Sequence, residues 1–225
     1  MSNLAMENVT YRYRNSNQAA VKEASCVFEP GRLYAIMGPS GSGKSTLLSM
    51  LAGLDLPTEG DVRFADKSLR EMDLDRYRRE DISMIFQAFQ LFPLLTALEN
   101  VCYPMELVGI SPKEAKDRAE QLLLRVGIKK EQMKRFPSNL SGGEQQRVAI
   151  ARSLASGAKI FLADEPTGNL DVNNSENIME ILSGLAHEDG YCVIVVTHDM
   201  DVAKHADVMF RMTDGAITVG LVFDN

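Results

Sequence analysis

Apolar residues in this chain recur with the spacings that predict strands. "LAMENVTYRY" (4–13) alternates apolar and polar residues, as a half-buried strand does. "KIFLAD" (159–164) and "YCVIVVTH" (191–198) are almost wholly apolar, which is typical of parallel strands covered on both faces. Further strands are expected in "RLYAIMG" (Arg32–Gly38), "GDVRFAD" (60–66) and "DISMIFQ" (81–87), and in the two halves of "DVMFRMTDGAITV" (207–219), joined by a turn at Asp214 and Gly215.

Other segments have the apolar density or the capping residues of helices. "STLLSMLAGL" (Ser45–Leu54) is apolar enough for a core helix. The segment 111–127 begins with Ser111 as N-cap, Pro112 at the first helical position and Glu114 to complete a capping box. A further helix precedes the strand at 191–198, and its apolar face carries Ile178, Ile181, Leu182 and Leu185.

The pattern changes from strands to helices beyond Gln87, which predicts how the chain is organised. We expect one domain over residues 1–225 of the α/β class, with a mostly parallel core sheet. Its α/β core takes about residues 1–87 and 141–225. A mainly helical subdomain is inserted at about residues 88–140.

Composition and charge narrow the functional class. The 225 residues are 45% hydrophobic and 24% charged, which is ordinary for a soluble globular protein. A net charge of −7 argues against a nucleic-acid-binding surface. Cys26, Cys102 and Cys192 lack metal-ligand spacing and are expected to pack as small hydrophobes in a reducing compartment. No signal sequence or membrane-spanning run is visible, so we expect a cytosolic protein.

A glycine-rich loop carries the strongest chemical signal. "GPSGSGKST" fits the pattern G-x-x-x-x-G-K-[ST], in which successive backbone N–H groups surround a phosphate. Lys44 would reach the β- and γ-phosphates, and the Ser45 hydroxyl would bind Mg²⁺. The alternative is a flexible turn before a helix, but the preceding strand and following helix favour a nucleoside triphosphate site. Its residues are Gly38, Pro39, Ser40, Gly41, Ser42, Gly43, Lys44, Ser45 and Thr46.

Two acidic residues follow the strand "KIFLAD" directly. Ligands gather at the carboxyl ends of parallel strands, so Asp164 can hold Mg²⁺ through its water shell. Glu165 is placed to polarise the water that attacks the γ-phosphate, as a general base. Alone the pair would be a polar turn after a strand. Together with the upstream phosphate loop it predicts a hydrolase.

The stretch "LSGGEQQRVAIARSL" (140–154) pairs two glycines with a helix start. Ser141 and Glu144 form an S-x-x-E capping-box pattern, which predicts an ordinary helix N-terminus. That pattern does not explain Gly142 and Gly143, because glycine is costly there unless the backbone must meet something closely. Free N–H groups at a helix start form an anion site, yet the phosphate of this protomer already has its own loop.

These motifs together resemble the nucleotide-binding subunits of ABC transporters. "LSGGE" is similar to the signature LSGGQ of that family, and the aromatic residue, phosphate loop, lone glutamine, signature, acidic strand end and histidine follow in the family's order. The resemblance covers essentially the whole chain. It implies a P-loop ABC ATPase fold with an added antiparallel β subdomain, which hydrolyses ATP with Mg²⁺. It also implies an ATP-bound head-to-tail homodimer, in which the signature closes over the ATP of the partner.

The resemblance assigns roles to individual residues. Tyr13 is similar to the aromatic that stacks on adenine, with Tyr11 as the alternative because a short insert follows. Gln87 resembles the glutamine that senses Mg²⁺ and the attacking water. Asp171 resembles the aspartate that links the two sites of the dimer, although it can also be the N-cap of the next helix. His198 is similar to the switch histidine that contacts the γ-phosphate.

Glu144 stands where many members of the family have glutamine. An acid beside the phosphate of a partner is electrostatically awkward, but Glu144 can fold back to cap its own helix instead. With "LADEPTGNLD", the signature phrase looks most like the subgroup that serves lipoprotein release, macrolide export, cell division and peptide-antibiotic resistance.

The resemblance implies a separate integral membrane subunit of the permease type. It would dock near residues 88–108, which are rich in Phe, Leu and Met, although about half of these residues must be core. The chain would then lie on the cytoplasmic face of the membrane. The alternatives are a cell-division type ATPase that works mechanically and a soluble protein acting on DNA or ribosomes; the acidic balance disfavours the latter. A small P-loop kinase is a fourth and remote alternative.

Overall fold

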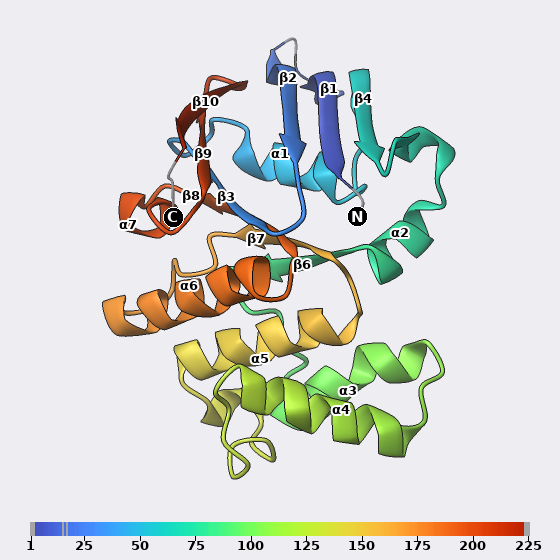
Figure 1. Cartoon of the computed structure of the whole chain (residues 1–225), viewed down its shortest axis with the longest axis vertical. Coiled ribbons are helices and arrows are strands. Elements are labelled where there is room, and N and C mark those ends of the chain that lie inside the picture. The colour runs from blue at the N-terminus through green and yellow to red at the C-terminus, as the bar shows by residue number, and fades with distance from the viewer. Residues whose placement is uncertain (1–2, 15, 17, 223–225) are drawn as a thin grey trace.

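A computed structural model describes residues 3–14, 16 and 18–222, which form two sheets with helices around and below them (Figure 1). The four-stranded sheet has the order β2-β1-β4-β5 and is antiparallel throughout. The six-stranded sheet has the order β10-β9-β3-β8-β7-β6, and all its strands except β10 are parallel. The expected fold class, with its mostly parallel core sheet and antiparallel β subdomain, is confirmed.

The strands lie mainly where the apolar pattern predicts them. Their bounds are β1 Leu4–Arg12, β2 Ala19–Phe28, β3 Arg32–Met37, β4 Glu59–Phe64, β5 Lys67–Ser68, β6 Ile82–Phe86, β7 Ile160–Asp164, β8 Cys192–Thr197, β9 Val208–Thr213 and β10 Ala216–Val222. The sequence did not reveal β2. Its buried positions include Ala24 and Cys26, whose small side chains weaken the alternation that identifies a strand.

Seven α-helices occur in the described part of the chain. They are α1 Lys44–Leu51, α2 Leu74–Glu80, α3 Ala97–Leu107, α4 Pro112–Arg125, α5 Gly142–Ala155, α6 Val172–His187 and α7 Met200–Ala203. Helix α1 ends earlier than expected because Gly53 adopts φ 64 just beyond it. Ser111 caps α4 as predicted, but the carboxylate of Glu114 bonds to Arg118 instead of completing a capping box.

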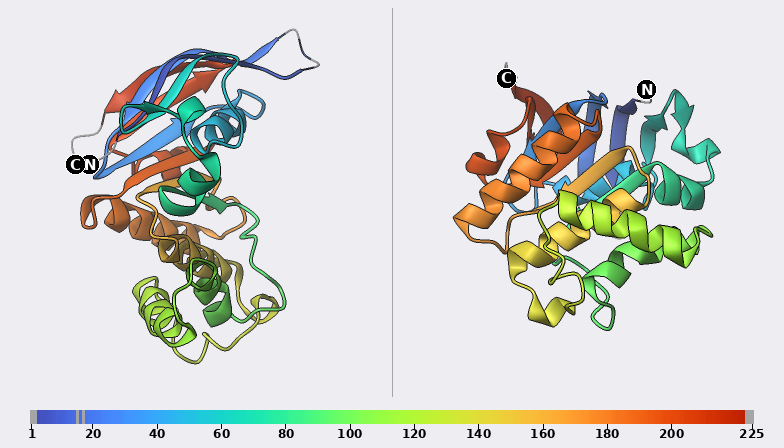
Figure 2. Two further views of the ribbon diagram at one scale, coloured as in Figure 1. Left: turned by 90° about the vertical axis from the view of Figure 1, so that its right-hand side faces the viewer. Right: turned by 60° about the horizontal axis from the view of Figure 1, so that its bottom comes forward.

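Helices α3, α4 and α5 pack together below the six-stranded sheet, and both views in Figure 2 show this helical layer apart from the β-rich part. Residues 88–140 contain α3, α4 and no strand. Because α5 contacts both α3 and α4, the layer extends past residue 140. Within the described residues, no helix combines the length and apolarity that a membrane crossing requires.

The six-stranded sheet separates two hydrophobic cores. Leu33 and Ala35 of β3 face the core shared with the helices, whereas Tyr34 and Ile36 face the core shared with the antiparallel sheet and α1. Burial on both faces explains the near-continuous apolar runs of the central strands. Burial also raises the pKa of the Cys26 and Cys192 thiols to about 12, which supports their expected role as packing residues.

Candidate functional site

Two glycines of the phosphate loop, Gly38 and Gly43, lie where the surrounding chain leaves no room for a side chain. The loop connects the end of β3 to Lys44, the first residue of α1. A Cβ atom at Gly43 would lie 2.2 Å from the carbonyl oxygen of Ala20, and one at Gly38 would lie 2.2 Å from that of Met212. Gly43 also has φ 103, a conformation that favours glycine. The loop shape is therefore imposed by tertiary contacts as well as by its own sequence.

A cavity of about 710 Å³ opens over this loop. The carboxyl ends of β6, β7 and β8 bring acidic and polar side chains to it, as expected for parallel strands. Its lining consists of Tyr13, Ala20, Pro39, Ser40, Gly41, Gly43, Lys44, Ser45, Thr46, Gln87, Asp164, Glu165 and His198. The structure thus gathers most of the predicted site residues, which are spread from Tyr13 to His198 along the chain, in one place.

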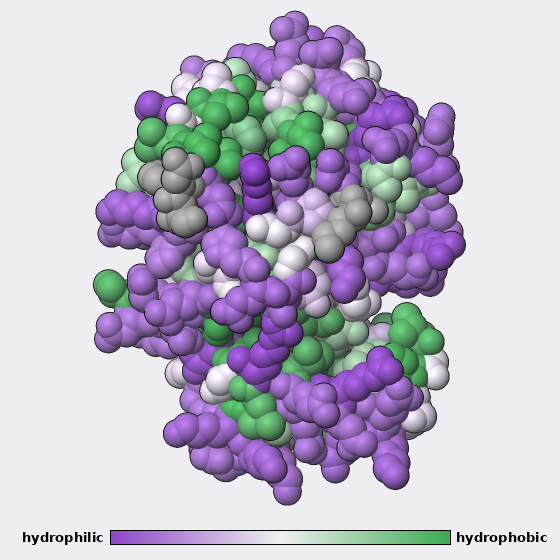
Figure 3. Space-filling view, in the orientation of Figure 1, coloured by the Kyte–Doolittle hydropathy of each residue, from purple (hydrophilic) through white to green (hydrophobic). Residues whose placement is uncertain are grey.

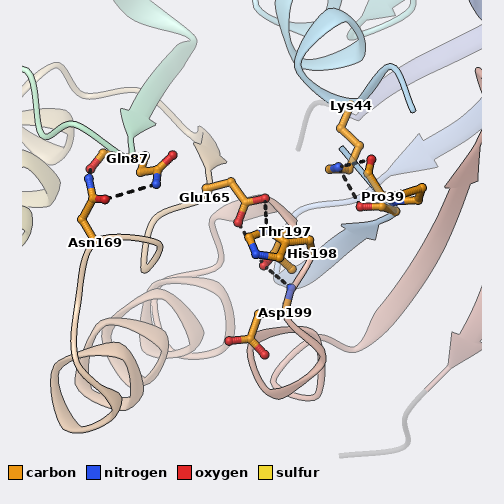
Figure 4. Close-up of polar contacts among 9 residues, drawn as sticks. Pro39, Lys44, Gln87, Glu165, Asn169, Thr197, His198 and Asp199 are labelled. Atoms are coloured by element: carbon orange, nitrogen blue, oxygen red, sulfur yellow. Dashed lines mark hydrogen bonds and ion pairs between the residues drawn. The ribbon is translucent and has the colours of Figure 1, made fainter. Parts of the chain in front are cut away.

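The polar groups of the loop suit an anionic ligand. Lys44 is buried, and its Nζ donates to the carbonyl oxygens of Gly38 at 2.8 Å and Pro39 at 2.9 Å (Figure 4). The hydroxyl of Ser42 is buried and has no hydrogen-bond partner among the residues that the structure describes. Gly43 offers no side-chain cap to α1, so the first N–H groups of that helix are left for a ligand.

Ser45 and Asp164 form an oxygen-rich pair suited to Mg²⁺. Burial raises the pKa of Asp164, and the charge of Glu165 acts in the same direction. A hydrogen bond with Ser45 and the charge of Lys44 oppose that shift. A half-buried carboxylate with raised pKa gains from a cation beside it, so the donor set fits the expected metal.

Glu165 and His198 make a short polar contact in the cavity. Nδ1 of His198 lies 2.7 Å from Oε1 of Glu165, and Thr197 donates to Oε2 at 3.4 Å (Figure 4). Glu165 has φ 49, and its N–H donates to the carbonyl of Val196 at 3.0 Å. A glutamate in this strained conformation is held by its surroundings, here by the end of β8.

Gln87 bonds to a residue that the sequence did not single out. Its Nε2 donates to Oδ1 of Asn169 at 3.3 Å, and Nδ2 of Asn169 donates to the backbone carbonyl of Gln87 at 3.0 Å (Figure 4). A Cβ atom at Gly168 would lie 2.7 Å from Nε2 of Gln87, so a side chain there would displace the Gln87 amide. The amide–amide pair joins the end of β6 to the loop before α6.

Of the two candidate tyrosines, Tyr13 lines the cavity and Tyr11 does not. The hydroxyl of Tyr13 lies 2.8 Å from Oγ1 of Thr46, and its side chain is exposed. Tyr11 is half-buried and meets the Tyr13 ring edge-on, at 5.1 Å between centroids. Tyr11 packs against the core of the antiparallel sheet, as a strand aromatic does.

Ser141 and Glu144 form the predicted capping box at the start of α5. The hydroxyl of Ser141 accepts from the N–H of Glu144 at 3.3 Å, and Oε2 of Glu144 accepts from the N–H of Ser141 at 2.7 Å. The other carboxylate oxygen accepts from Nε2 of Gln132. The expectation that Glu144 folds back onto its own helix is confirmed.

The glycine pair meets side chains of its own chain. A Cβ atom at Gly143 would lie 2.1 Å from Oδ1 of Asn174, and one at Gly142 would lie 3.3 Å from Cδ2 of Leu170. This close approach gives Gly143 a structural reason that the sequence pattern did not show. The signature residues do not line the cavity, so one protomer does not bring them to the phosphate loop.

Asp171 is the N-cap of α6, as one of its two interpretations predicts. Oδ1 accepts from the N–H of Asn174 at 2.9 Å and Oδ2 accepts from Nδ2 of Asn174 at 2.7 Å. These bonds lower the pKa of Asp171. Asn174 therefore connects the cap of α6 to Gly143 at the start of α5.

Comparison with known proteins decides the family. The profile of the ABC transporter family matches residues 21–168. The chain belongs to the ABC transporter family. It is 40% identical over 219 residues to the ABC transporter ATP-binding protein YclH of Bacillus subtilis, with 97% of each chain covered. It is 45% identical over 201 residues to the macrolide export ATP-binding/permease protein MacB of Rhodopseudomonas palustris, covering 88% of this chain and 30% of MacB.

Solved ABC cassettes have the same fold. The dimeric cassette MJ0796 bound to ADP and phosphate after hydrolysis aligns with a TM-score of 0.89 and 39% identity, covering 99% of this chain and 100% of that one. Its sequence, from Methanocaldococcus jannaschii, is 42% identical over 222 residues, covering 95% of this chain and 94% of MJ0796. The chain is an ABC ATPase, the ATP-hydrolysing motor component of a transporter.

Proposed function

We propose that this ABC ATPase works as a head-to-tail homodimer, in which each phosphate loop and the signature of the partner enclose one ATP. The main support for this proposal is that one protomer does not bring all the predicted ATP-binding residues together. The cavity of one protomer contains the phosphate loop, the acids and the histidine, whereas Ser141, Gly142 and Gly143 lie outside it. The related cassette MJ0796 is also dimeric, which supports a dimer of this chain.

The start of α5 has donors to spare for the phosphate of a partner. Its capping box uses the N–H groups of Ser141 and Glu144. The N–H groups of Gly142 and Gly143 have no intrahelical acceptor, because they occupy the first turn. Because Glu144 turns both oxygens toward its own chain, its charge does not oppose an approaching phosphate as an unpaired acid would.

Within each site the residues of the cavity divide the work of hydrolysis. Lys44 exchanges the carbonyl oxygens of Gly38 and Pro39 for the β- and γ-phosphate oxygens. Glu165 accepts a proton from the attacking water, and His198 orients Glu165 and contacts the γ-phosphate. Tyr13 stacks on adenine, and Asp171 links the two sites across the dimer.

Mg²⁺ would be held by Ser45 and Asp164, with Gln87 at its edge, and when bound it neutralises charge on the phosphates. Gln87 lines the same cavity as Lys44 and would sense Mg²⁺ and the attacking water. ATP then closes the dimer, and hydrolysis reopens it.

Closure would act on a separate membrane subunit of the permease type, docked near residues 88–108. The support for this is an apolar surface of exposed Phe92, Leu94, Tyr103, Leu107 and Val108, which we call the docking surface. Figure 3 shows exposed apolar side chains at the end of the helical layer where α3 ends. The subunit would hold this chain on the cytoplasmic face of the membrane.

Affinity capture from native membranes tests the docking role. Glu165→Gln with ATP is used to hold the closed state, in mild detergent. We expect a membrane protein with several spans to co-purify, and Leu94→Asp in that background to abolish its capture. Leu54→Asp is the matched control, because Leu54 is also exposed but lies outside the docking surface. Recovery of soluble partners alone, such as ribosomes or DNA, would contradict the transporter role.

A further inference from the structure

The loop 87–96, which runs from the end of β6 to the N-cap of α3, has an unusual backbone. Phe89 has φ 56 and Gln90 has φ 50, so two consecutive residues that are not glycine lie in the left-handed region. The N–H of Gln90 donates to the carbonyl of Ala88 at 2.5 Å, which closes a tight turn around Phe89. This conformation costs free energy for residues with a Cβ atom, so surrounding contacts must hold it.

Arg152, in the last turn of α5, supplies those contacts. Its Nη1 donates to the carbonyl oxygen of Gln90 at 2.7 Å, and Nη2 donates to that of Phe89 at 3.2 Å. The guanidinium also lies over the ring of Phe92, 5.8 Å from its centroid. A planar guanidinium suits two neighbouring acceptors and an aromatic face at once, whereas an ammonium does not.

The partners of Arg152 are unusual for a half-buried charge. Among the described residues, it has two carbonyl oxygens and no carboxylate within 4.0 Å. Burial lowers the pKa of Arg152, which reflects the cost of removing this charge from water. Arg118, in contrast, pairs with Glu114 on the exposed face of α4. Arg152 therefore stabilises the conformation of the loop, although burying its guanidinium costs free energy of desolvation.

The loop is fixed at both ends as well. Asn169 holds the amide and backbone of Gln87 at one end. At the other end the fully buried Asn100 of α3 accepts from the N–H of Phe92 at 2.8 Å and donates to the carbonyls of Phe92, Leu95 and Thr96. Phe89 in the middle reaches the signature, where its Cζ would lie 3.6 Å from a Cβ atom on Gly142.

We propose that Arg152 is a positioning residue for ATP hydrolysis, which fixes the loop 87–96 to α5. With this bond in place, Gln87 in the cavity, Phe92 on the docking surface and the signature at the start of α5 move as one body. A displacement of the docking surface is therefore transmitted to Gln87, because the loop 87–96 does not deform. The inference rests on the proposed role of Gln87 in hydrolysis.

The experiment compares Arg152→Lys and Arg152→Met with the wild-type chain. In both variants we expect kcat for ATP to fall about ten- to hundredfold with KM unchanged, because a small displacement of a positioned group slows chemistry more than binding. Amide hydrogen exchange should accelerate in residues 88–92 and stay unchanged in α1 and β7. Arg118→Met is the matched control, an arginine on the same helical layer that does not touch the loop, and should leave both readouts unchanged.

Each outcome decides the question. Wild-type kcat in both Arg152 variants, exchange that accelerates equally throughout the chain, or failure of both variants to fold would overturn the positioning role. Gln87→Ala is measured alongside to separate the two proposals. If Gln87→Ala hydrolyses ATP at the wild-type rate, the role of Gln87 in the proposed function fails. If Gln87→Ala is slow while the Arg152 variants are fast, only the inference about Arg152 fails.

Discussion

Two helices of this cassette, α1 and α5, begin beside paired or closely spaced glycines, but their N-termini are capped differently. Helix α1 follows Gly43, has no side-chain cap, and opens into the cavity of about 710 Å³. Helix α5 follows Ser141, has a complete capping box, and lies outside that cavity. The N-terminus of α1 is suited to bind the phosphate of a nucleotide held by its own protomer. The N-terminus of α5 is capped by its own residues, and the N–H groups of Gly142 and Gly143 are left for an acceptor that another molecule supplies.

The glycines of the two regions are also required by different neighbours. Gly38 and Gly43 are confined by backbone carbonyls of Met212 and Ala20, which belong to the sheets. Gly143 is confined by the side chain of Asn174, which also bonds to the cap residue Asp171. The phosphate loop is therefore fixed to a rigid scaffold. The signature is fixed to the start of α6, because Asn174 contacts Gly143 and bonds to Asp171. A shift of the start of α6 would therefore move the signature as well.

The largest effect is expected at the base. Glu165→Gln should bind ATP as the wild type does but lower kcat by about 10²–10⁴-fold, because an amide cannot accept the proton of the attacking water. Phosphate release in the steady state and equilibrium binding of ATP measure the two quantities. Glu120→Gln, a change on the surface of α4, is the control. Phosphate release near the wild-type rate in Glu165→Gln would remove this residue from the role.

Alanine at one glycine of each region separates the two helix starts. Gly43→Ala should lose ATP binding in the monomer, because its Cβ atom would meet the Ala20 carbonyl at 2.2 Å. Gly143→Ala should keep ATP binding in the monomer and weaken ATP-dependent dimers, since Asn174 must shift to admit the methyl group. Each change costs about 1–3 kcal/mol of stability. Gly31→Ala controls for backbone strain alone, because Gly31 has φ 79 and a Cβ atom there would have no atom of the described residues within 4 Å. Equal loss of ATP binding at Gly43 and Gly143 would contradict the division.

A smaller effect concerns the pH dependence of the nucleotide-free fold. Because burial raises the pKa of Asp164 above its ordinary value of 3.8, the ionised form opposes folding. Ionisation of Asp164 should therefore lower the free energy of unfolding of the wild type as the pH rises from 3.8 to above the raised pKa. Asp164→Asn should remove that loss and raise Tm at neutral pH. Thermal unfolding of both proteins across this range measures it, and a lower Tm for Asp164→Asn at neutral pH would contradict the raised pKa.

The parts of this structure that could be predicted from the sequence are those in which the decisive residues lie close together in the chain. The phosphate loop, the acids after β7 and the capping box at α5 each occupy a few consecutive residues, so composition and spacing reveal them. The sequence could not show that Tyr11 packs against the core while Tyr13, just beyond the end of β1, lines the cavity. Strand β2 was missed because alanine and cysteine carry little apolar signal.

The residues that connect these motifs could not be predicted, because they act across long separations in the chain. Asn169 reaches Gln87 over 82 positions and Arg152 reaches the carbonyls of residues 89 and 90 over 63 and 62 positions. An asparagine or arginine on a loop or helix surface has no local pattern that marks such a partner. The predicted capping box at Glu114 was wrong for a different, local reason, since Arg118 one turn later offers the carboxylate an ionic partner.

Equilibrium sedimentation of Glu165→Gln with ATP, with and without Ser141→Arg, shows whether the signature of one protomer completes the ATP site of the other. We expect ATP-dependent dimers of Glu165→Gln and monomers of the double variant, because the arginine would fill the space of the partner's phosphate while ATP binding in each monomer is unchanged. Dimers of equal strength in both proteins would contradict the shared site.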